Sequence, residues 1–378
     1  MSGTLEIYGT LGPSCENTEI LRQMFAEGIT GMRLNLSHGT LKKNAGMIDS
    51  FHEAAAREGV SPSLLIDLQG PELRIGEVEQ GRYLMEGSGV FLVSREKALP
   101  DAEGDAAKEQ QAVIKGTSCH GGIPVPEEIF DHYEEGMILL IDDGKIRLKA
   151  SDLIREENGT RIRALVLTGG TLLSRKSIAV QERQITGNTL TKQDLENLSC
   201  AAAFGVTDVM QPFVRGAADL AEVRKVMKES GAGNCRLFAK IENRAGIGSL
   251  GEILPLTDML VIARGDLGNA VPLWELPYVQ KEISRECLKA GVPFMVVTQM
   301  LASMENAPVP TRAEVSDIFN AVADGAGAVM ITGESASGRF PVQAASYLVK
   351  TARMGLKWRE KEQRESKQQD SIKKGDAG

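Results

Sequence analysis

The chain has 378 residues, of which 42% are hydrophobic and 25% are charged, and its formal net charge is -8. This composition is typical of a globular protein with one large domain or two to three smaller ones. The acidic balance argues against a nucleic-acid-binding surface, which would show a basic patch. Five scattered cysteines without a CxxC pair indicate free thiols in a reducing compartment. There is no basic-then-apolar leader and no apolar run of membrane-spanning length, so we expect a soluble, cytoplasmic protein without a membrane partner.

The first part of the chain alternates short apolar runs with helical patterns. The run LEIYGTLG precedes a helix over residues 18–27, which Gly28 closes. In MRLNLSHG the polar residues Arg33, Asn35 and Ser37 alternate with leucines, so we expect these three side chains on one face of a strand. A helix through KKNAGMIDSFHEAAARE follows, and the third apolar run stops at Asp67.

Residues 71–177 break this rhythm, because the helical pattern gives way to short alternating segments such as VFLVS, ILLIDDGKIRLKA and RIRALVLTGG. The pair Asp143-Gly144 between two apolar runs is a strong hairpin signal. The segment predicts a small all-β lid domain inserted after the third strand.

The alternation of strand and helix then resumes, with Thr191 as a helix N-cap. Outside the insertion the strand-like runs number eight, at Leu5, Met32, Leu64, Asp208, Leu237, Met259, Phe294 and Val329. Eight βα units favour an α/β fold of the (β/α)8 TIM barrel type over a doubly wound sheet. We therefore expect a catalytic barrel in residues 1–70 and 178–358, and a polar, disordered tail in residues 359–378.

Three successive runs, in FAKIENRAGIG, MLVIARGDLG and MVVTQM, each end in a polar group at the carboxyl end of a buried parallel strand. A barrel places its chemistry at that end. Glu242 and Asp266 suit a hard cation such as Mg²⁺, or Glu242 is a helix-start acid paired with Lys240 or Arg244. Lys240 beside Glu242 can be a simple salt bridge, although its burial favours a functional role. Thr298 alone can be an ordinary strand residue.

A second cluster follows the second and third strands and contains Arg33, Asn35, Ser37 and Asp67. Its neutral oxygens and carboxylate could hold a monovalent cation and its arginine a phosphate, or the cluster is a hydrogen-bonded polar layer at the barrel rim. His38 and Arg74 lie nearby in sequence and could equally be solvated loop residues. The segment ARGDLG offers backbone N–H groups at a helix start, and no GxGxxG or P-loop motif is present.

Taken together, the motifs resemble those of the pyruvate kinase family. The matching strings are TLGPS, MRLNLSHGT, DLQGPELRIG, ILLIDDGKI, FAKIENRAGI, VIARGDLG, VTQMLASM, PVPTRAEVSD and TGESASGRFPV, and they occur in the family's order. The resemblance implies a barrel interrupted by a β lid and the transfer of a phosphoryl group from phosphoenolpyruvate to ADP, giving pyruvate and ATP. It also implies Mg²⁺ (or Mn²⁺) and K⁺ as cofactors.

The resemblance also implies roles for individual residues. The catalytic residues would be Lys240, Thr298 and Arg33, and Gly265 and Asp266 would join them in binding the substrate. Glu242 and Asp266 would hold Mg²⁺. The K⁺ ligands would be Asn35, Ser37, Asp67 and the carbonyl of Leu68, with Glu72 as the acid that accompanies potassium dependence. His38, Arg74 and Lys176 would lie on the nucleotide side.

Departures from the family pattern fall mostly on the nucleotide side and near the insertion. They are Gln69, Pro212, Ala270, Ser337 and the segment RKSIAV, in which Lys176 is retained. The chain also ends after the eighth barrel helix, so we expect the family's C-terminal effector-binding domain to be missing. Three alternatives follow: an active pyruvate kinase, a weak or inactive relative that binds phosphoenolpyruvate or a partner as sensor or scaffold, and an enzyme acting on another enolpyruvate or 2-oxo acid. We also expect a homo-oligomer through the barrel helices, because a large apolar face is rarely left exposed.

Overall fold

The computed structural model describes residues 5–78, 82–94, 122–142, 144–156, 159–181 and 188–375. The chain divides into two compact units, one formed by Met1–Gly70 with Thr189–Gly378 and the other by Pro71–Asn188. We expected the insertion to end at residue 177, whereas the second unit extends to Asn188.

The first unit is a closed barrel of parallel strands in the order β1-β16-β15-β14-β13-β12-β3-β2. The strands are β1 (Glu6–Thr10), β2 (Gly31–Asn35), β3 (Ser63–Asp67), β12 (Asp208–Gln211), β13 (Arg236–Ile241), β14 (Met259–Ala263), β15 (Phe294–Val297) and β16 (Ala328–Met330). The sequence prediction of a (β/α)8 barrel with an insertion after the third strand is therefore confirmed.

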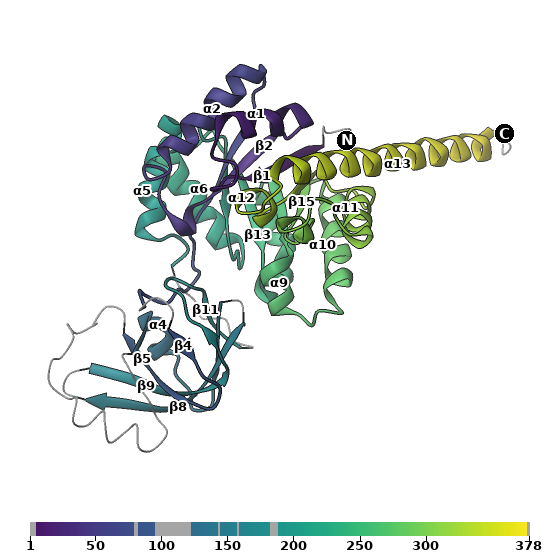
Figure 1. The fold of residues 1–378 in the computed structure, drawn as a ribbon. Coiled ribbons are helices and arrows are strands. Elements are labelled where there is room, and N and C mark those ends of the chain that lie inside the picture. Colours follow the sequence, from purple (N-terminus) through teal and green to yellow (C-terminus); the bar gives the residue numbers. More distant parts are fainter. Residues whose placement is uncertain are drawn as a thin grey trace. The chain divides into compact units, whose positions relative to one another are not determined.

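Helices surround these strands, as Figure 1 shows. They are α1 (Thr18–Glu27), α2 (Ala45–Glu58), α5 (Lys192–Cys200), α6 (Ala217–Glu229), α7 (Arg244–Gly248), α8 (Leu250–Ile253), α9 (Arg264–Ala270), α10 (Leu276–Ala290), α11 (Arg312–Ala323), α12 (Gly333–Ala336) and α13 (Pro341–Gly375). Short 3₁₀ turns are η1 (Leu36–His38), η2 (Ala201–Phe204), η3 (Leu254–Leu256) and η4 (Ala302–Glu305). Two predicted helix ends are confirmed: Gly28 closes α1 with a left-handed backbone conformation, and Thr191 is the N-cap of α5.

Helix α13 corrects the expectation of a disordered tail from residue 359, because it continues to Gly375 (yellow in Figure 1). The first part of this helix packs against α1 and α11, and Trp358 contacts the ring of Phe319. The polar residues that follow are good helix formers and carry ion pairs one turn apart, Arg364 with Glu360 and Lys361 with Glu365. Continuation of a packed helix needs no new nucleation, so these residues remain helical without an apolar face.

The inserted unit is mainly β. A six-stranded sheet has the order β11-β7-β8-β9-β5-β6, and β10 pairs with β4. The bounds are β4 (Tyr83–Leu84), β5 (Gly89–Ser94), β6 (Ile123–Val125), β7 (Ile138–Ile141), β8 (Ile146–Glu156), β9 (Gly159–Thr168), β10 (Gly170–Thr171) and β11 (Ile178–Val180). One short helix, α4 (Glu127–Asp131), departs from the all-β expectation. Strands β7 and β8 form the predicted hairpin, with Gly144 in the left-handed region and Asp143 outside the described residues.

An ion-pair network closes the amino end of the barrel. Arg236 donates to Glu6 Oε1 at 2.8 Å and to Asp208 Oδ1 at 2.6 Å, and the Tyr8 hydroxyl donates to Glu6 at 2.7 Å. Burial, with Asp208 and Glu6 beside it, holds the pKa of Tyr8 far above its ordinary value, so this hydroxyl stays protonated. The network stabilises the end of the barrel opposite the one where parallel barrels carry their chemistry.

Cys15, Cys200, Cys235 and Cys287 are free thiols, and Cys119 lies outside the described residues. Among the helices that the structure describes, none combines the length and apolarity that crossing a membrane requires.

Candidate functional site

The alternation of side chains along three barrel strands determines which residues meet at the carboxyl end. Leu34, Ile66 and Ala239 belong to the core between strands and helices, whereas Leu65 and Phe238 belong to the core inside the barrel. Because successive strand residues point to opposite faces, the polar positions Arg33, Asn35, Asp67 and Lys240 follow the inward register. The strand pairings place Arg33 beside Leu65, and Asn35 beside Asp67.

The three charged side chains of this set and Glu242, which follows β13, form one chain of ion pairs. Arg33 donates through Nε at 2.9 Å and through Nη2 at 2.7 Å to Asp67 Oδ2. Lys240 Nζ lies 3.3 Å from the same oxygen and 3.0 Å from Glu242 Oε1. The side chains of Asp67 and Glu242 are buried, and that of Lys240 is 13% exposed. The sequence predicted each residue separately, and the structure brings all four together.

Burial and charge act in opposite directions on these groups. Burial alone favours neutral Lys240, but Asp67 and Glu242 outweigh it and hold the pKa of this amine above its ordinary value of 10.5. Burial likewise opposes ionisation of Asp67, but Lys240 and Arg33 hold the pKa of this carboxyl below its ordinary value of 3.8. Lys240 and Asp67 therefore keep their opposite charges across the whole neutral pH range.

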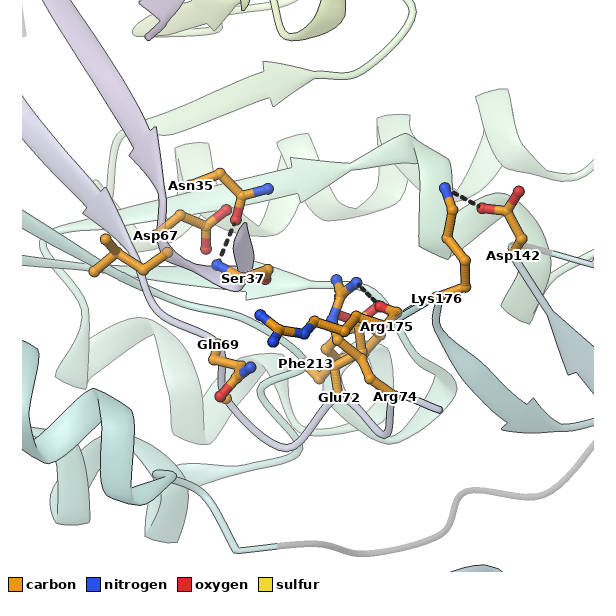
Figure 2. Close-up of polar contacts among 12 residues, drawn as sticks. Asn35, Ser37, Asp67, Gln69, Glu72, Arg74, Asp142, Arg175, Lys176 and Phe213 are labelled. Atoms are coloured by element: carbon orange, nitrogen blue, oxygen red, sulfur yellow. Dashed lines mark hydrogen bonds and ion pairs between the residues drawn. The ribbon is translucent and has the colours of Figure 1, made fainter. Parts of the chain in front are cut away.

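The second oxygen of Asp67 makes this position a candidate for a cation. Among the described residues, the buried Oδ1 atom of Asp67 has no hydrogen-bond partner. An unsatisfied buried acceptor costs about 1–3 kcal/mol, so a bound cation would relieve a real deficit. Figure 2 shows Asn35 and Ser37 beside Asp67, and the Asn35 side-chain oxygen accepts from the Ser37 backbone N–H at 3.1 Å. These oxygens suit the K⁺ site that the resemblance implies.

Ser37 reaches this cluster in a different way from the one we expected. The strand β2 ends at Asn35, and Ser37 lies in the 3₁₀ turn η1 instead of continuing the strand. The turn begins there because the Asn35 side chain caps it by accepting from Ser37, which offers the backbone an alternative to the sheet. Leu68 directly follows β3 and donates its N–H to Met210 at 3.0 Å.

Glu242 and Asp266 are the candidate ligands for a divalent cation. Glu242 Oε2 accepts from the N–H of Phe213 at 2.8 Å, and Asp266 contributes to the field at Lys240. Within the described part of the chain there is no group of three or more His, Cys, Asp or Glu side chains in position to hold a metal. Two carboxylates with substrate and water oxygens fit the usual Mg²⁺ site of phosphoryl-transfer enzymes. The sequence also allowed Glu242 to be an ion-pair partner of Lys240, and the structure shows this pair. One carboxylate can pair with Lys240 and also hold a cation, so the two roles are compatible.

Thr298 occupies a strained backbone position at the end of β15. Its φ is 81°, and that of Gln299 is 55°. A β-branched residue in this region is a genuine outlier, and such strain is concentrated at functional sites. Arg264 donates to the Thr298 carbonyl at 2.7 Å and pairs with Asp317 at 2.6 Å. Gly265 leaves room for Thr298, because a Cβ on Gly265 would lie 3.0 Å from Thr298 Cγ2.

The residues predicted for the nucleotide side do not all lie in the barrel unit. His38 ends η1, and its side chain lies outside the described part. Arg74 and Lys176 belong to the inserted unit, where Arg74 pairs with Glu72 and donates to the Arg175 carbonyl at 2.9 Å. Lys176 pairs there with Asp142 at 2.9 Å (Figure 2).

Sequence reasoning missed several residues that shape the site through its backbone. Gln193 and Asp194 both lie in the first turn of α5. Gln193 donates to carbonyls of the loop after β2, and Asp194 accepts from N–H groups of the loop after β3. The pattern Thr191-x-x-Asp194 is a capping box and was a usable signal for the helix start. Its second function, holding another loop, had no signal in the sequence.

Comparisons with known proteins agree with this geometry. A family model described as pyruvate kinase, barrel domain, matches residues 3–345. A relative named pyruvate kinase from Bacillus licheniformis is 33% identical over 339 residues, which is 90% of this chain and 55% of the relative. One from Geobacillus stearothermophilus is 33% identical over 344 residues, or 91% and 55% of the two chains. One from Agrobacterium vitis is 36% identical over 346 residues, or 91% and 66%.

The chain thus spans about 55% of the length of the first of these relatives, and the shared part includes the barrel and the insertion. The family model matches all of the chain but its two ends, and the structure is a closed (β/α)8 barrel with the charged cluster at its carboxyl end. The chain therefore belongs to the pyruvate kinase family.

Proposed function

We propose that this chain transfers a phosphoryl group from phosphoenolpyruvate to a nucleoside diphosphate, giving pyruvate and the triphosphate. The observation that carries the proposal is the buried cluster of Arg33, Asp67, Lys240 and Glu242 at the carboxyl end of the barrel strands. Phosphoryl transfer depends on positioning and on neutralising charge more than on a covalent partner, and this cluster can do both.

Lys240 would act on the transferred group as a permanent cation. Its raised pKa keeps it charged at any working pH, and its buried position strengthens its field. Its charged partners among the described residues are Asp67 and Glu242, so its three N–H donors leave capacity for a phosphoryl oxygen. Arg33 is held by Asp67 through Nε and Nη2, so that Nη1 can meet a phosphate in a fixed orientation.

Two cations would complete the charge balance. Glu242 and Asp266 would hold Mg²⁺ or Mn²⁺, and K⁺ would lie against Asn35, Ser37, Asp67 and the Leu68 carbonyl. When bound, these ions would neutralise the enolpyruvate and phosphoryl oxygens. Gly265 and Thr298 would position the carbon that becomes the methyl group of pyruvate, and the strain at Thr298 supports a functional role for that turn. His38, Arg74 and Lys176 would contact ADP or ATP.

The proposal is tested by pyruvate release from phosphoenolpyruvate with Mg²⁺, K⁺ and each of several nucleoside diphosphates. We expect turnover that requires both cations and that falls by orders of magnitude in Lys240→Met. A matched control is Lys281→Met, which removes a surface ion pair with Asp324 on the outer helices. Absence of turnover with every diphosphate would refute catalysis and favour a protein that binds phosphoenolpyruvate or a partner as a sensor.

That second candidate rests on the substituted positions near the nucleotide side. The Ser337 hydroxyl donates to the Gly333 carbonyl at 3.3 Å, and Gln69 is held by its backbone N–H. Calorimetry with phosphoenolpyruvate, combined with the turnover assay, separates the two functions, because a sensor would bind phosphoenolpyruvate without any diphosphate-dependent turnover. Heat of binding without catalysis, unchanged in Lys240→Met, would support the sensor, whereas a large drop in turnover for that variant would exclude it.

We also propose that the barrel helices form a homo-oligomer in a cytoplasmic protein. Leu273, Trp274, Tyr278 and Leu288 are exposed at and before α10, with Trp274 83% exposed. Large exposed apolar side chains on a helix and on the segment before it favour an interaction surface. Light scattering over a range of concentrations tests this, and a monomer at every concentration would contradict it.

A further inference from the structure

The first turn of α5 holds both loops that carry the proposed K⁺ ligands. Gln193 Nε2 donates to the carbonyls of Leu36 at 3.0 Å and Gly39 at 2.9 Å. The next residue, Asp194, accepts from the N–H groups of Gln69 at 2.7 Å and Gly70 at 3.0 Å. Two adjacent side chains therefore bind the loop after β2 and the loop after β3.

The bond from Gln69 to Asp194 determines where the Leu68 carbonyl points. The N–H of Gln69 and the C=O of Leu68 belong to the same peptide group, which is planar and trans. In such a group the N–H and the C=O point in opposite directions, so fixing the N–H on Asp194 turns the Leu68 carbonyl away from it. Asp194 thereby orients a main-chain oxygen that it does not touch.

Gln193 acts in the same way on the other loop. It binds the carbonyl of Leu36, which shares a peptide group with the N–H of Ser37. That N–H points in the opposite direction and meets Asn35 Oδ1 at 3.1 Å. The orientation of Asn35 relative to Ser37 thus depends on a glutamine that lies 157 residues from Leu36 in the sequence.

Asp194 is suited to this task as a carboxylate and not as an amide. It is wholly buried, and besides the two loop N–H groups it accepts from the Thr191 N–H at 2.9 Å and the Thr191 hydroxyl at 2.8 Å. All four partners are donors to a group that in its ionised form offers only acceptors. An asparagine would turn an NH₂ group toward one or more of these donors.

The backbone at Gly70 confirms that the loop has little freedom there. Its φ is 59°, and a Cβ would lie 2.5 Å from Pro212 Cγ, so the position accepts neither a side chain nor an easy change of path. The loop is thus held between Pro212 and Asp194.

We propose that Asp194 and Gln193 are positioning residues for the monovalent-cation site, setting the directions of the Leu68 carbonyl and of Asn35 and Ser37. Neither residue contacts the ion. The inference rests on the cation site of the proposed function. Residues that orient metal ligands without touching the metal commonly change its affinity by about 10–100-fold.

The test measures K⁺ binding without substrates or turnover. The thermal unfolding midpoint of the full chain is followed as KCl replaces choline chloride at constant ionic strength, and the half-saturating K⁺ concentration is taken from the rise. We expect Asp194→Asn and Gln193→Leu each to raise that concentration about tenfold or more. The matched control is Thr191→Ala, which removes the cap hydroxyl of α5 and leaves the bonds to Gln69 and Gly70. It should lower the unfolding midpoint at every K⁺ concentration equally.

Equal half-saturating K⁺ concentrations in Asp194→Asn, Gln193→Leu and the unmodified chain would overturn the inference. A chain stabilised no more by K⁺ than by choline would also overturn it, because there would be no site to position. If Asp194→Asn does not fold, Gln193→Leu decides the matter, since it leaves the α5 capping box intact. Because this experiment does not measure pyruvate formation, its result is independent of the turnover assay. The inference can fail while the proposed function stands, and the proposed function can fail while the inference stands.

Discussion

Replacing Lys240 with methionine tests whether the buried ion-pair chain has the energetics that its geometry implies. The substitution keeps most of the side-chain volume and leaves Asp67 and Glu242 as buried carboxylates without their shared cation. Removing one partner of a buried pair typically lowers the free energy of unfolding by about 3–5 kcal/mol. We expect about 3 kcal/mol, the low end of this range, because Arg33 still binds Asp67 and the Phe213 N–H still binds Glu242.

The pH dependence of this loss follows from the direction of each shift. The lowered pKa of Asp67 contributes stability that is present above 3.8 and is lost as the pH falls through the folded-state pKa. The raised pKa of Lys240 contributes stability that is complete below 10.5 and is lost only as the pH rises through the folded-state pKa. The difference between the two proteins should therefore be largest at neutral pH, shrink as the pH falls below 3.8, the ordinary pKa of Asp67, and shrink again as the pH rises above 10.5, the ordinary pKa of Lys240.

Urea unfolding followed by circular dichroism at a helix wavelength measures this difference in the barrel. Of the helices that the structure describes, only the short α4 lies in the inserted unit, so the signal reports on the barrel. The control is Lys281→Met, whose pair with Asp324 has side chains 64% and 31% exposed and should cost at most about 1 kcal/mol. The reasoning would be refuted if Lys240→Met lowered the free energy of unfolding no more than the control does, or if the decrease stayed the same at low pH.

Three further predictions concern the two ends of the barrel. Arg236→Met should lower the free energy of unfolding by roughly 2 kcal/mol without changing turnover, because its partners Glu6 and Asp208 lie at the amino end; urea unfolding and the pyruvate assay check both. Gly265→Ala should reduce kcat about tenfold or more by displacing Thr298, whereas Gly268→Ala, with its nearest neighbour at 3.7 Å, should not. Thr298→Gly and Gln299→Gly should each relieve about 1 kcal/mol of backbone strain in urea unfolding, but only the first should lose turnover.

Local patterns were sufficient for the barrel itself. The eight apolar runs predicted the strands because a buried parallel strand is recognisable from its own residues, and Gly28 and Thr191 marked helix ends through local backbone chemistry. The same locality explains the errors. Residues from 359 onward have no apolar face, but α13 extends through them because a packed helix precedes them.

The sequence by itself determined which residues reach the carboxyl end of the barrel, since the two-residue period of each strand assigns its inward positions. Only the tertiary structure decided which of them meet. Lys240 and Asp67 are separated by 173 residues, and closure of the sheet brings their strands to one mouth. The opposite charges that raise the pKa of Lys240 and lower that of Asp67 in spite of burial, the strain at Thr298 and the hold of Asp194 on the loop after β3 all depend on neighbours that no local pattern contains.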